Sequence, residues 1–311
     1  YQLGTYVCPM HYYGDESLYD YDNNSFGFVK GDLSSVRAKT TTPLGAGPYV
    51  FEKYENKIAY FTANENYWQG APVTKEVQFK VTSNADKESG VVQGTIDIAD
   101  PSASKSALEQ IAGENSNGEI SGDVLTTVLT DYNGYGYIGM NSQTLSVGGD
   151  NASEASKDLR KAIATVIAVY RDVVIDSYYG DAASVINYPI SNTSWAAPQA
   201  SDPDYKVAFS TDVDGNDIYT DSMTEDEKYA AALEAALGYF EAAGYTVTDG
   251  KLTAAPEGAK LSYEVLIAGG GSGDHPSFGI LTAASEALKT IGFDLVINDL
   301  TDSSILWSSI E

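Results

Sequence analysis

The most informative stretch of this sequence is PLGAGPYVFE at residues 43–52, continued by NENYWQGAP at residues 64–72. A glycine–proline turn leads into residues 47–54, and a second extended run covers residues 58–64. Both runs are rich in the tyrosine, phenylalanine and valine that strands favour. We therefore expect a β-hairpin, followed by a third strand over residues 76–81, where apolar and polar residues alternate.

Composition indicates a folded, strongly acidic chain. Its 311 residues include 44 Asp and Glu but only 18 Lys and Arg, for a formal net charge of −26. A chain of this length can bury a substantial core and favours two lobes over one compact domain. The shortage of cations argues against binding to nucleic acid, whose phosphates need neutralising, and against an anionic membrane surface.

The single cysteine, Cys8, excludes a disulfide within the chain. This cysteine usage suits either a bacterial cytosolic protein or a secreted protein that folds without bridges. No apolar run in the sequence has the length that spans a bilayer. No basic-then-apolar signal segment stands at its start, so the signal of an exported protein would lie outside this sequence.

The second half of the chain alternates predicted helices and strands. Residues 158–177 place their apolar side chains on one face of a helix that Gly180 can terminate. Thr224–Glu227 has the form of a capping box and starts a helix that runs to Ala243, with Gly244 as a left-handed stop. A strand, a helix and a second strand follow, an order that predicts two parallel strands joined by a right-handed crossover.

Those last two strands are expected at residues 263–268 and 293–298, and the loop GGGSGDHP at residues 269–276 follows the first of them. Pro276 suits the first position of the next helix, with Asp274 or His275 as its N-cap. Ligands of open α/β sheets bind beyond the carboxyl ends of strands, where helix amino termini offer free N–H donors. We therefore predict ligand contacts from Gly271, Ser272, Asp274 and His275.

His275 is expected at the rim of a cleft, where it can hold a carboxylate or a carbonyl group. The competing interpretation is a flexible connector with a solvated histidine. Three aromatic residues are further ligand-binding candidates, because flat rigid rings suit a binding surface: Tyr135, Tyr137 and Trp195. Ordinary core or surface packing is the alternative for each of them. We expect extended segments at Val124–Leu129 and Tyr135–Asn141.

Enzymatic and metal-binding patterns are poor. His11 and His275 fall in different predicted lobes, and neither a nucleophile elbow nor a zinc-protease motif is present. Residues 212–217, DVDGND, resemble a calcium loop. Aligning Gly215 with its invariant glycine, however, places a serine first and an aspartate last. A solvated acidic turn explains the sequence better, and we predict no catalytic residue, metal or cofactor.

The order of motifs resembles that of bacterial extracellular solute-binding proteins of family 5, the peptide/nickel-binding component of ABC transporters. Gly-x-Gly-Pro-Tyr at residues 45–49 and Asn-x-x-Tyr-Trp at residues 64–68 come first. An Asp-x-Arg-x-Ala-Ile helix at residues 158–163 follows. Ala-Ala-Gly-Tyr at residues 242–245 and Ile-Gly-Phe-Asp-Leu at residues 291–295 complete the series.

This resemblance implies a mixed α/β fold of the periplasmic-binding-protein-like type II, with two lobes joined by crossing strands. Residues 1–134 would form part of lobe I, which is mainly β, and residues 135–311 an α/β lobe II. Parts of the family fold have no counterpart here: the beginning of the first lobe, a small extra domain and the return segment of the second lobe. We therefore expect an incomplete fold.

The resemblance also implies a function without catalysis: capture of oligopeptides or a similar small solute for the permease subunits of an ABC importer. The expected protein is monomeric and binds no nucleic acid. It would lie outside the cytoplasm, as a cell-surface lipoprotein or in a periplasm. In peptide-binding relatives, an acidic residue that holds the ligand's amino group follows the position of Glu311. A secreted hydrolase and a surface adhesin or signalling module remain the alternatives.

Overall fold

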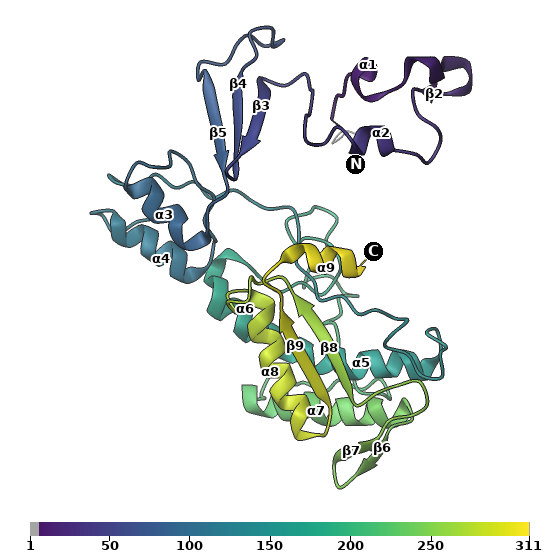
Figure 1. Ribbon diagram of the computed structural model, residues 1–311. Coiled ribbons are helices and arrows are strands. Elements are labelled where there is room, and N and C mark those ends of the chain that lie inside the picture. The colour runs from purple at the N-terminus through teal and green to yellow at the C-terminus, as the bar shows by residue number, and fades with distance from the viewer. Residues whose placement is uncertain (1–5, 311) are drawn as a thin grey trace. The chain divides into compact units, whose positions relative to one another are not determined.

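The computed structural model describes residues 6–310, and Figure 1 shows the path of the chain. The chain divides into two compact units, residues 1–100 and 101–311, and each is described by itself. The lobe boundary predicted after Gly134 lies inside the second of these units. The division of the whole protein into two lobes at that point stays a prediction. Among residues 6–310, no helix combines the length and apolarity that a bilayer crossing needs.

The first unit begins with short elements. They are α1 (Met10–Tyr13), η2 (Glu16–Leu18), β1 (Tyr19–Asp20), η3 (Tyr21–Asn23), β2 (Ser25–Phe26) and α2 (Ser34–Arg37). Two tyrosines of this region bond to the loop that precedes the hairpin. Tyr12 donates its hydroxyl to the Thr42 carbonyl at 2.6 Å, and the Leu44 amide donates to the Tyr13 hydroxyl at 2.8 Å.

A three-stranded antiparallel sheet dominates the first unit, in the order β3 (Tyr49–Glu55), β4 (Ile58–Ala63) and β5 (Glu76–Lys80). The predicted hairpin and third strand are therefore confirmed. Both turn residues between β3 and β4 have positive φ, as a two-residue hairpin turn requires. One aromatic ring from each strand forms a ladder across the sheet, with centroids 5.6 and 5.7 Å apart. Helix α3 (Asn84–Val92) follows the sheet.

The second unit begins with α4 (Lys105–Glu114), a helix that the sequence patterns did not reveal. Its N-cap is Ser104, whose side chain accepts the Ala107 amide at 3.3 Å. The two extended segments predicted at 124–129 and 135–141 carry no regular secondary structure. A strand needs a neighbouring strand for its ladder, and the described residues supply none beside these segments.

Two helices replace the one predicted at 158–177. Helix α5 (Glu154–Val169) ends at Tyr170, and α6 (Arg171–Tyr179) starts directly after it, followed by a short 3-10 turn, η4 (Gly180–Ala182). Gly180 ends α6 with φ +56°, as predicted for a stop. The Val174 amide donates to the Tyr170 carbonyl, so the series of backbone hydrogen bonds of α6 starts at Tyr170.

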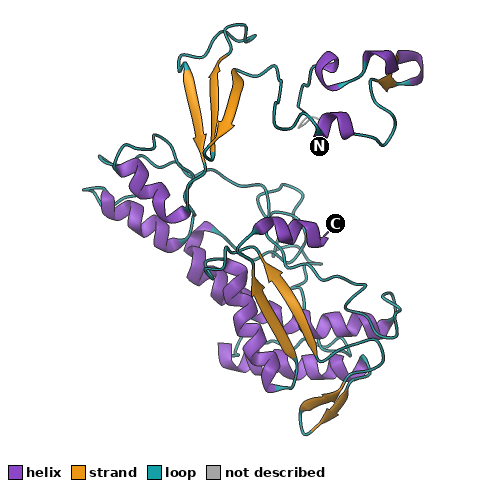
Figure 2. Ribbon diagram, in the orientation of Figure 1, coloured by secondary structure: helices purple, strands orange, loops and turns teal. Residues whose placement is uncertain are grey.

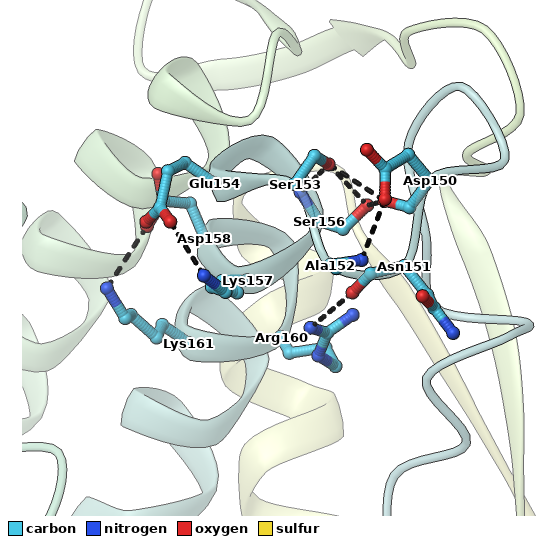
Figure 3. Close-up of polar contacts among 10 residues, drawn as sticks. All are labelled: Asp150, Asn151, Ala152, Ser153, Glu154, Ser156, Lys157, Asp158, Arg160 and Lys161. Carbon is cyan, nitrogen blue, oxygen red and sulfur yellow. Dashed lines mark hydrogen bonds and ion pairs between the residues drawn. The ribbon is translucent and has the colours of Figure 1, made fainter.

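Polar side chains fasten the start of α5 to the preceding loop (Figure 3). Ser153 is the N-cap and accepts the Ser156 amide at 3.2 Å. Ser156 is fully buried, and its hydroxyl donates to the Asp150 carbonyl and accepts the Val147 amide at 2.8 Å. Arg160 donates to two carbonyl oxygens of the same loop, both at 2.9 Å. The loop is thereby held on the helix by several hydrogen bonds, most of them partly buried.

Helix α7 (Glu225–Ala242) packs on α5. Its predicted capping box is confirmed: Thr224 accepts the Glu227 amide at 3.3 Å, and the Glu227 carboxylate accepts the Thr224 amide at 2.8 Å. Gly244 has φ +93°, the left-handed conformation predicted for a helix stop. The hairpin that follows was not predicted, although its Asp-Gly turn is a known hairpin signal. Its strands are β6 (Thr246–Thr248) and β7 (Lys251–Ala254).

The last part of the chain forms a parallel strand pair with a crossover helix, as predicted. Strands β8 (Ser262–Ile267) and β9 (Asp294–Asp299) pair in parallel, α8 (Pro276–Thr290) connects them, and α9 (Ser303–Ile310) follows. In Figure 2 the two strands lie side by side and pass in front of α5 and α7. The core between them is centred on Phe240 and Phe293, both fully buried with ring centroids 5.0 Å apart.

We expect the Ser156→Ala substitution to lower the free energy of unfolding by about 1–3 kcal/mol, because it leaves the half-buried Val147 amide without its acceptor. Urea unfolding followed by far-ultraviolet circular dichroism measures this loss. Ser222→Ala is the matched control, since Ser222 is exposed. Equal stability of the two variants would contradict the structural role given to Ser156.

Candidate ligand-binding site

The glycine-rich loop predicted as a ligand site lies between β8 and α8. Gly270, Gly271 and Gly273 have φ of +72°, +70° and +70°, a conformation that side chains rarely adopt. His275 is the N-cap of α8, and its Nδ1 accepts the Ser277 amide at 3.1 Å. Pro276 occupies the first position of the helix, as predicted. The loop is therefore an ordered turn.

A carboxylate from the neighbouring strand closes this loop. The two side-chain oxygens of Asp299, the last residue of β9, accept the amides of Gly269 and Gly273, each at 2.8 Å. These hydrogen bonds, above all the one from Gly273, lower the pKa of Asp299. The loop thus uses two of its own amides on an internal anion, whereas we expected them to be free for a ligand.

The groups of the loop that can contact a ligand are the side chains of Asp274 and His275. Tyr178 on α6 donates its hydroxyl to Asp274 Oδ1 at 2.9 Å. The pKa of Tyr178 is raised by burial and by this carboxylate. Burial lowers the pKa of His275, against the opposite effect of Asp299 and Asp274. Because Nδ1 of His275 accepts a hydrogen bond, the ring is neutral with its proton on Nε2, which can donate to a carbonyl or carboxylate.

The pKa of His275 gives a testable pH dependence. A lowered pKa in the folded state means that this histidine stabilises the fold fully above its ordinary pKa of about 6.5. That stability is lost as the pH falls through the lowered value, because protonation of Nδ1 breaks the cap. His275→Asn keeps a capping side chain without a titrating ring. We expect melting temperatures between pH 7.5 and 5 to fall more steeply for the wild type than for this variant; parallel curves would contradict the assignment.

The glycine at the start of the loop is required by the approach of Asp299. A Cβ at Gly269 would lie 2.7 Å from Asp299 Oδ1, so an alanine there must displace the carboxylate. We expect Gly269→Ala to destabilise the second unit by about 1–3 kcal/mol in thermal unfolding. Gly136→Ala is the control, because a Cβ at Gly136 would meet nothing within 4 Å and the φ of this glycine is not positive. A neutral Gly269→Ala variant would show that the carboxylate is not needed there.

The aromatic candidates lie at the surface. Tyr135 and Tyr137 are 44% and 76% exposed, with ring centroids 6.3 Å apart, and Trp195 is 98% exposed. The Thr193 hydroxyl donates to Asn133 Oδ1 at 3.3 Å, so the loop that carries Trp195 contacts the segment that carries the two tyrosines. The structure therefore brings these two candidate segments together. Contact of these rings with a ligand stays a prediction.

The acidic turn at residues 212–217 is explained by its own hydrogen bonds. The Asp212 carboxylate accepts the amides of Asp214 and Asn216 at 3.0 and 2.8 Å, and the Asn216 side chain at 3.1 Å. These bonds lower the pKa of Asp212. Within the described part of the chain, no three His, Cys, Asp or Glu side chains group as metal ligands would. A solvated turn, the interpretation that we preferred, accounts for this geometry.

Two open surface hollows lie in the described part of the chain, and neither contains a predicted site residue. One, of about 290 Å³, lies in the first unit between the end of β5 and α3, around Thr82, Asp86 and Gln93. The other, of about 420 Å³, lies in the second unit beside the acidic turn and α7, around Asp212 and Glu234. Neither hollow therefore supports ligand binding at the predicted residues, whose contact with a ligand stays a prediction.

Asp299 and Tyr178 are the residues at this site that sequence reasoning missed. Asp299 had a usable signal. It ends a strand predicted to be parallel to the one before the loop, and the carboxyl ends of parallel strands meet at one edge of a sheet. Tyr178 had none, because its contact with Asp274 depends on how α6 packs against α8. The two histidines, His11 and His275, lie in different compact units.

Comparison with known proteins gives the family. A family model described as bacterial extracellular solute-binding proteins, family 5 Middle, matches residues 23–310, nearly the whole chain. The chain belongs to this family. No curated protein sequence matches the chain.

Solved structures agree on the fold of this family 5 chain. The oligopeptide-binding protein AppA from Bacillus subtilis, in complex with a nonapeptide, has a TM-score of 0.59 at 20% identity, over 97% of this chain and 49% of that one. NikZ from Campylobacter jejuni, in complex with Ni(L-His), has a TM-score of 0.54 at 18% identity, over 91% of this chain and 49% of that one. The predicted mixed α/β, periplasmic-binding-protein-like type II fold is confirmed, and this chain spans about half of it.

Proposed function

We propose that this family 5 chain is part of the substrate-binding component of an ABC importer, which captures oligopeptides or a similar small solute outside the cytoplasmic membrane. The observation that carries the proposal is the family match over residues 23–310. The likeness to AppA, whose structure holds a nonapeptide, supports peptides as the solute class. The permease subunits of the importer are the proposed partners, and the protein acts as a monomer without catalysis.

Two groups of residues are proposed to contact the solute. The loop closed by Asp299 offers the imidazole of His275 and the carboxylate of Asp274, and the backbone of Gly271 and Ser272 precedes them in the same loop. These groups can bond to a main-chain carbonyl and to a main-chain or terminal N–H. The exposed rings of Tyr135, Tyr137 and Trp195 supply flat surfaces that pack against any extended chain. Contacts of this kind recognise the main chain of a solute and not one particular side chain. We therefore expect the protein to bind solutes with broad selectivity.

A nickel–histidine complex is the second candidate solute. The likeness to NikZ, which was solved with Ni(L-His), favours it. In this case the metal is cargo that arrives with its own ligands. The neutral, half-buried His275 and the aromatic rings are groups that a nickel–histidine complex can contact through its imidazole and amino acid parts.

Thermal-shift measurements separate these solutes. At a hundredfold excess over the dissociation constant, a solute that binds only the folded state stabilises it by about 2.7 kcal/mol. We expect a pool of nonapeptides to raise the melting temperature and nickel with L-histidine to leave it unchanged. The reverse result would assign the nickel complex.

Three results, one from this screen and two from separate assays, would contradict import of a small solute. If neither pool shifts the melting temperature of the chain or of the full-length natural protein, solute capture is wrong. Turnover of chromogenic ester or peptide substrates would instead favour the hydrolase alternative. Pull-down of a surface partner, without any solute shift, would favour an adhesin or signalling module.

A further inference from the structure

We infer that Arg171 is a positioning residue, whose guanidinium fixes the start of the 186–208 loop to the end of α5, with Asn187 tying in the other end of the loop, and thereby holds Trp195 out for the solute. The positioning step stands on contacts within the second unit. The last step, contact with the solute, rests on the proposed function. The two steps have separate tests.

Arg171 is the first residue of α6, directly after the end of α5. Its Nε donates to the Ala168 carbonyl in the last turn of α5 at 3.2 Å. Its two terminal nitrogens donate to the Ile186 carbonyl at 3.2 Å and to Asn187 Oδ1 at 3.3 Å. All three acceptors are neutral. A half-buried cation is tolerated here because the carbonyl end of a helix carries a partial negative charge.

Asn187 joins the two ends of the loop. Its Oδ1 also accepts the Ala208 amide at 3.0 Å, and its Nδ2 donates to the Tyr205 hydroxyl at 2.9 Å. A second cross-link lies beside it: the Lys206 amide donates to the Tyr188 hydroxyl at 2.9 Å. The rings of Tyr188 and Tyr205 lie 5.5 Å apart between centroids. The neck of the loop is therefore closed by side chains, and Arg171 ties this neck to α5.

Trp195 is presented by an ordered tip. The Ser194 amide donates to the Ser191 carbonyl and the Ala197 amide to the Ser194 carbonyl, both at 3.0 Å. Ser191 and Ala197 are only 5% and 8% exposed, whereas Trp195 between them is 98% exposed. The indole ring of Trp195 stays in water although its flanking residues are buried. Exposing this much apolar surface costs free energy relative to burying it. Long ordered loops of this kind are usually functional.

The geometry requires arginine in particular. One planar fork reaches acceptors on two segments, the end of α5 and the neck of the loop. A lysine ammonium has a single nitrogen and cannot span the same set. Position 187 requires an acceptor for Arg171 and for the Ala208 amide. Aspartate supplies both and can accept from the Tyr205 hydroxyl, whereas leucine supplies none.

Hydrogen–deuterium exchange of the ligand-free chain tests the positioning step. We expect the amides of residues 191–208 to exchange at least tenfold faster in Arg171→Lys and in Asn187→Leu, and at the wild-type rate in Asn187→Asp. Amides of the core, such as Leu300, which bonds to Ile267, report on global unfolding. If Arg171→Lys loosens the core as well, the comparison of Asn187→Leu with Asn187→Asp decides. Unchanged loop exchange in the lysine and leucine variants would overturn the inference.

Solute affinity, measured with the nonapeptide pool, tests the second step. We expect Trp195→Ala and Arg171→Lys each to weaken binding about tenfold and the double variant to be no weaker than either alone, because both act through one contact. Trp68→Ala is the matched control, an exposed indole in the first unit. Wild-type affinity in Trp195→Ala would overturn the presentation of Trp195 while leaving solute capture intact. A wild type that binds no solute would refute the proposed function, and the exchange data would still decide the role of Arg171.

Discussion

The second unit depends on burying one face of a two-stranded parallel sheet. Two parallel strands have little stability by themselves and need helices over their apolar face. In β8 and β9 the alternate residues Tyr263, Val265, Ile267, Leu295 and Ile297 face the core. Helices α5, α7 and α8 close over them around Phe240 and Phe293. Because the pair is parallel, both strands end at the same edge, and the candidate site lies at that edge.

That shared edge brings Asp299 next to the glycine loop. A helix amino terminus with free amides is a common anion site, but here the protein places its own carboxylate on two of the loop amides. The carboxylate of Asp299 fixes the loop and reduces the number of backbone amides that are free to bind a ligand. The amides of Gly269 and Gly273 are already used by Asp299, so the proposed ligand contacts at this loop fall to the side chains of Asp274 and His275. A glycine-rich loop before a helix is therefore weak evidence for an anion site until its amides are accounted for.

The acidic surface contributes little to this architecture. The ion pairs of the described residues join lysines to carboxylates that are mostly exposed, and such pairs stabilise a fold only weakly. The half-buried Arg171 differs, because its partners are backbone and amide oxygens, one in the last turn of α5 and two at residues 186 and 187.

Local sequence determined the elements whose signals are local. The hairpin at residues 47–64, the capping box at Thr224 and the stop at Gly244 follow from turn and capping chemistry, which acts within a few residues. The order strand, helix, strand predicted the parallel pair around α8 through the crossover rule, although the pairing joins residues far apart in the chain. The order of motifs gave the family and the fold class.

Tertiary structure alone decided what depends on contacts between distant residues. It showed that Tyr178 lies on Asp274, that Arg171 holds the neck of the Trp195 loop, and that residues 124–141 have no neighbouring strand. A strand or a polar contact needs a partner in space, and one sequence does not say which partner will be there.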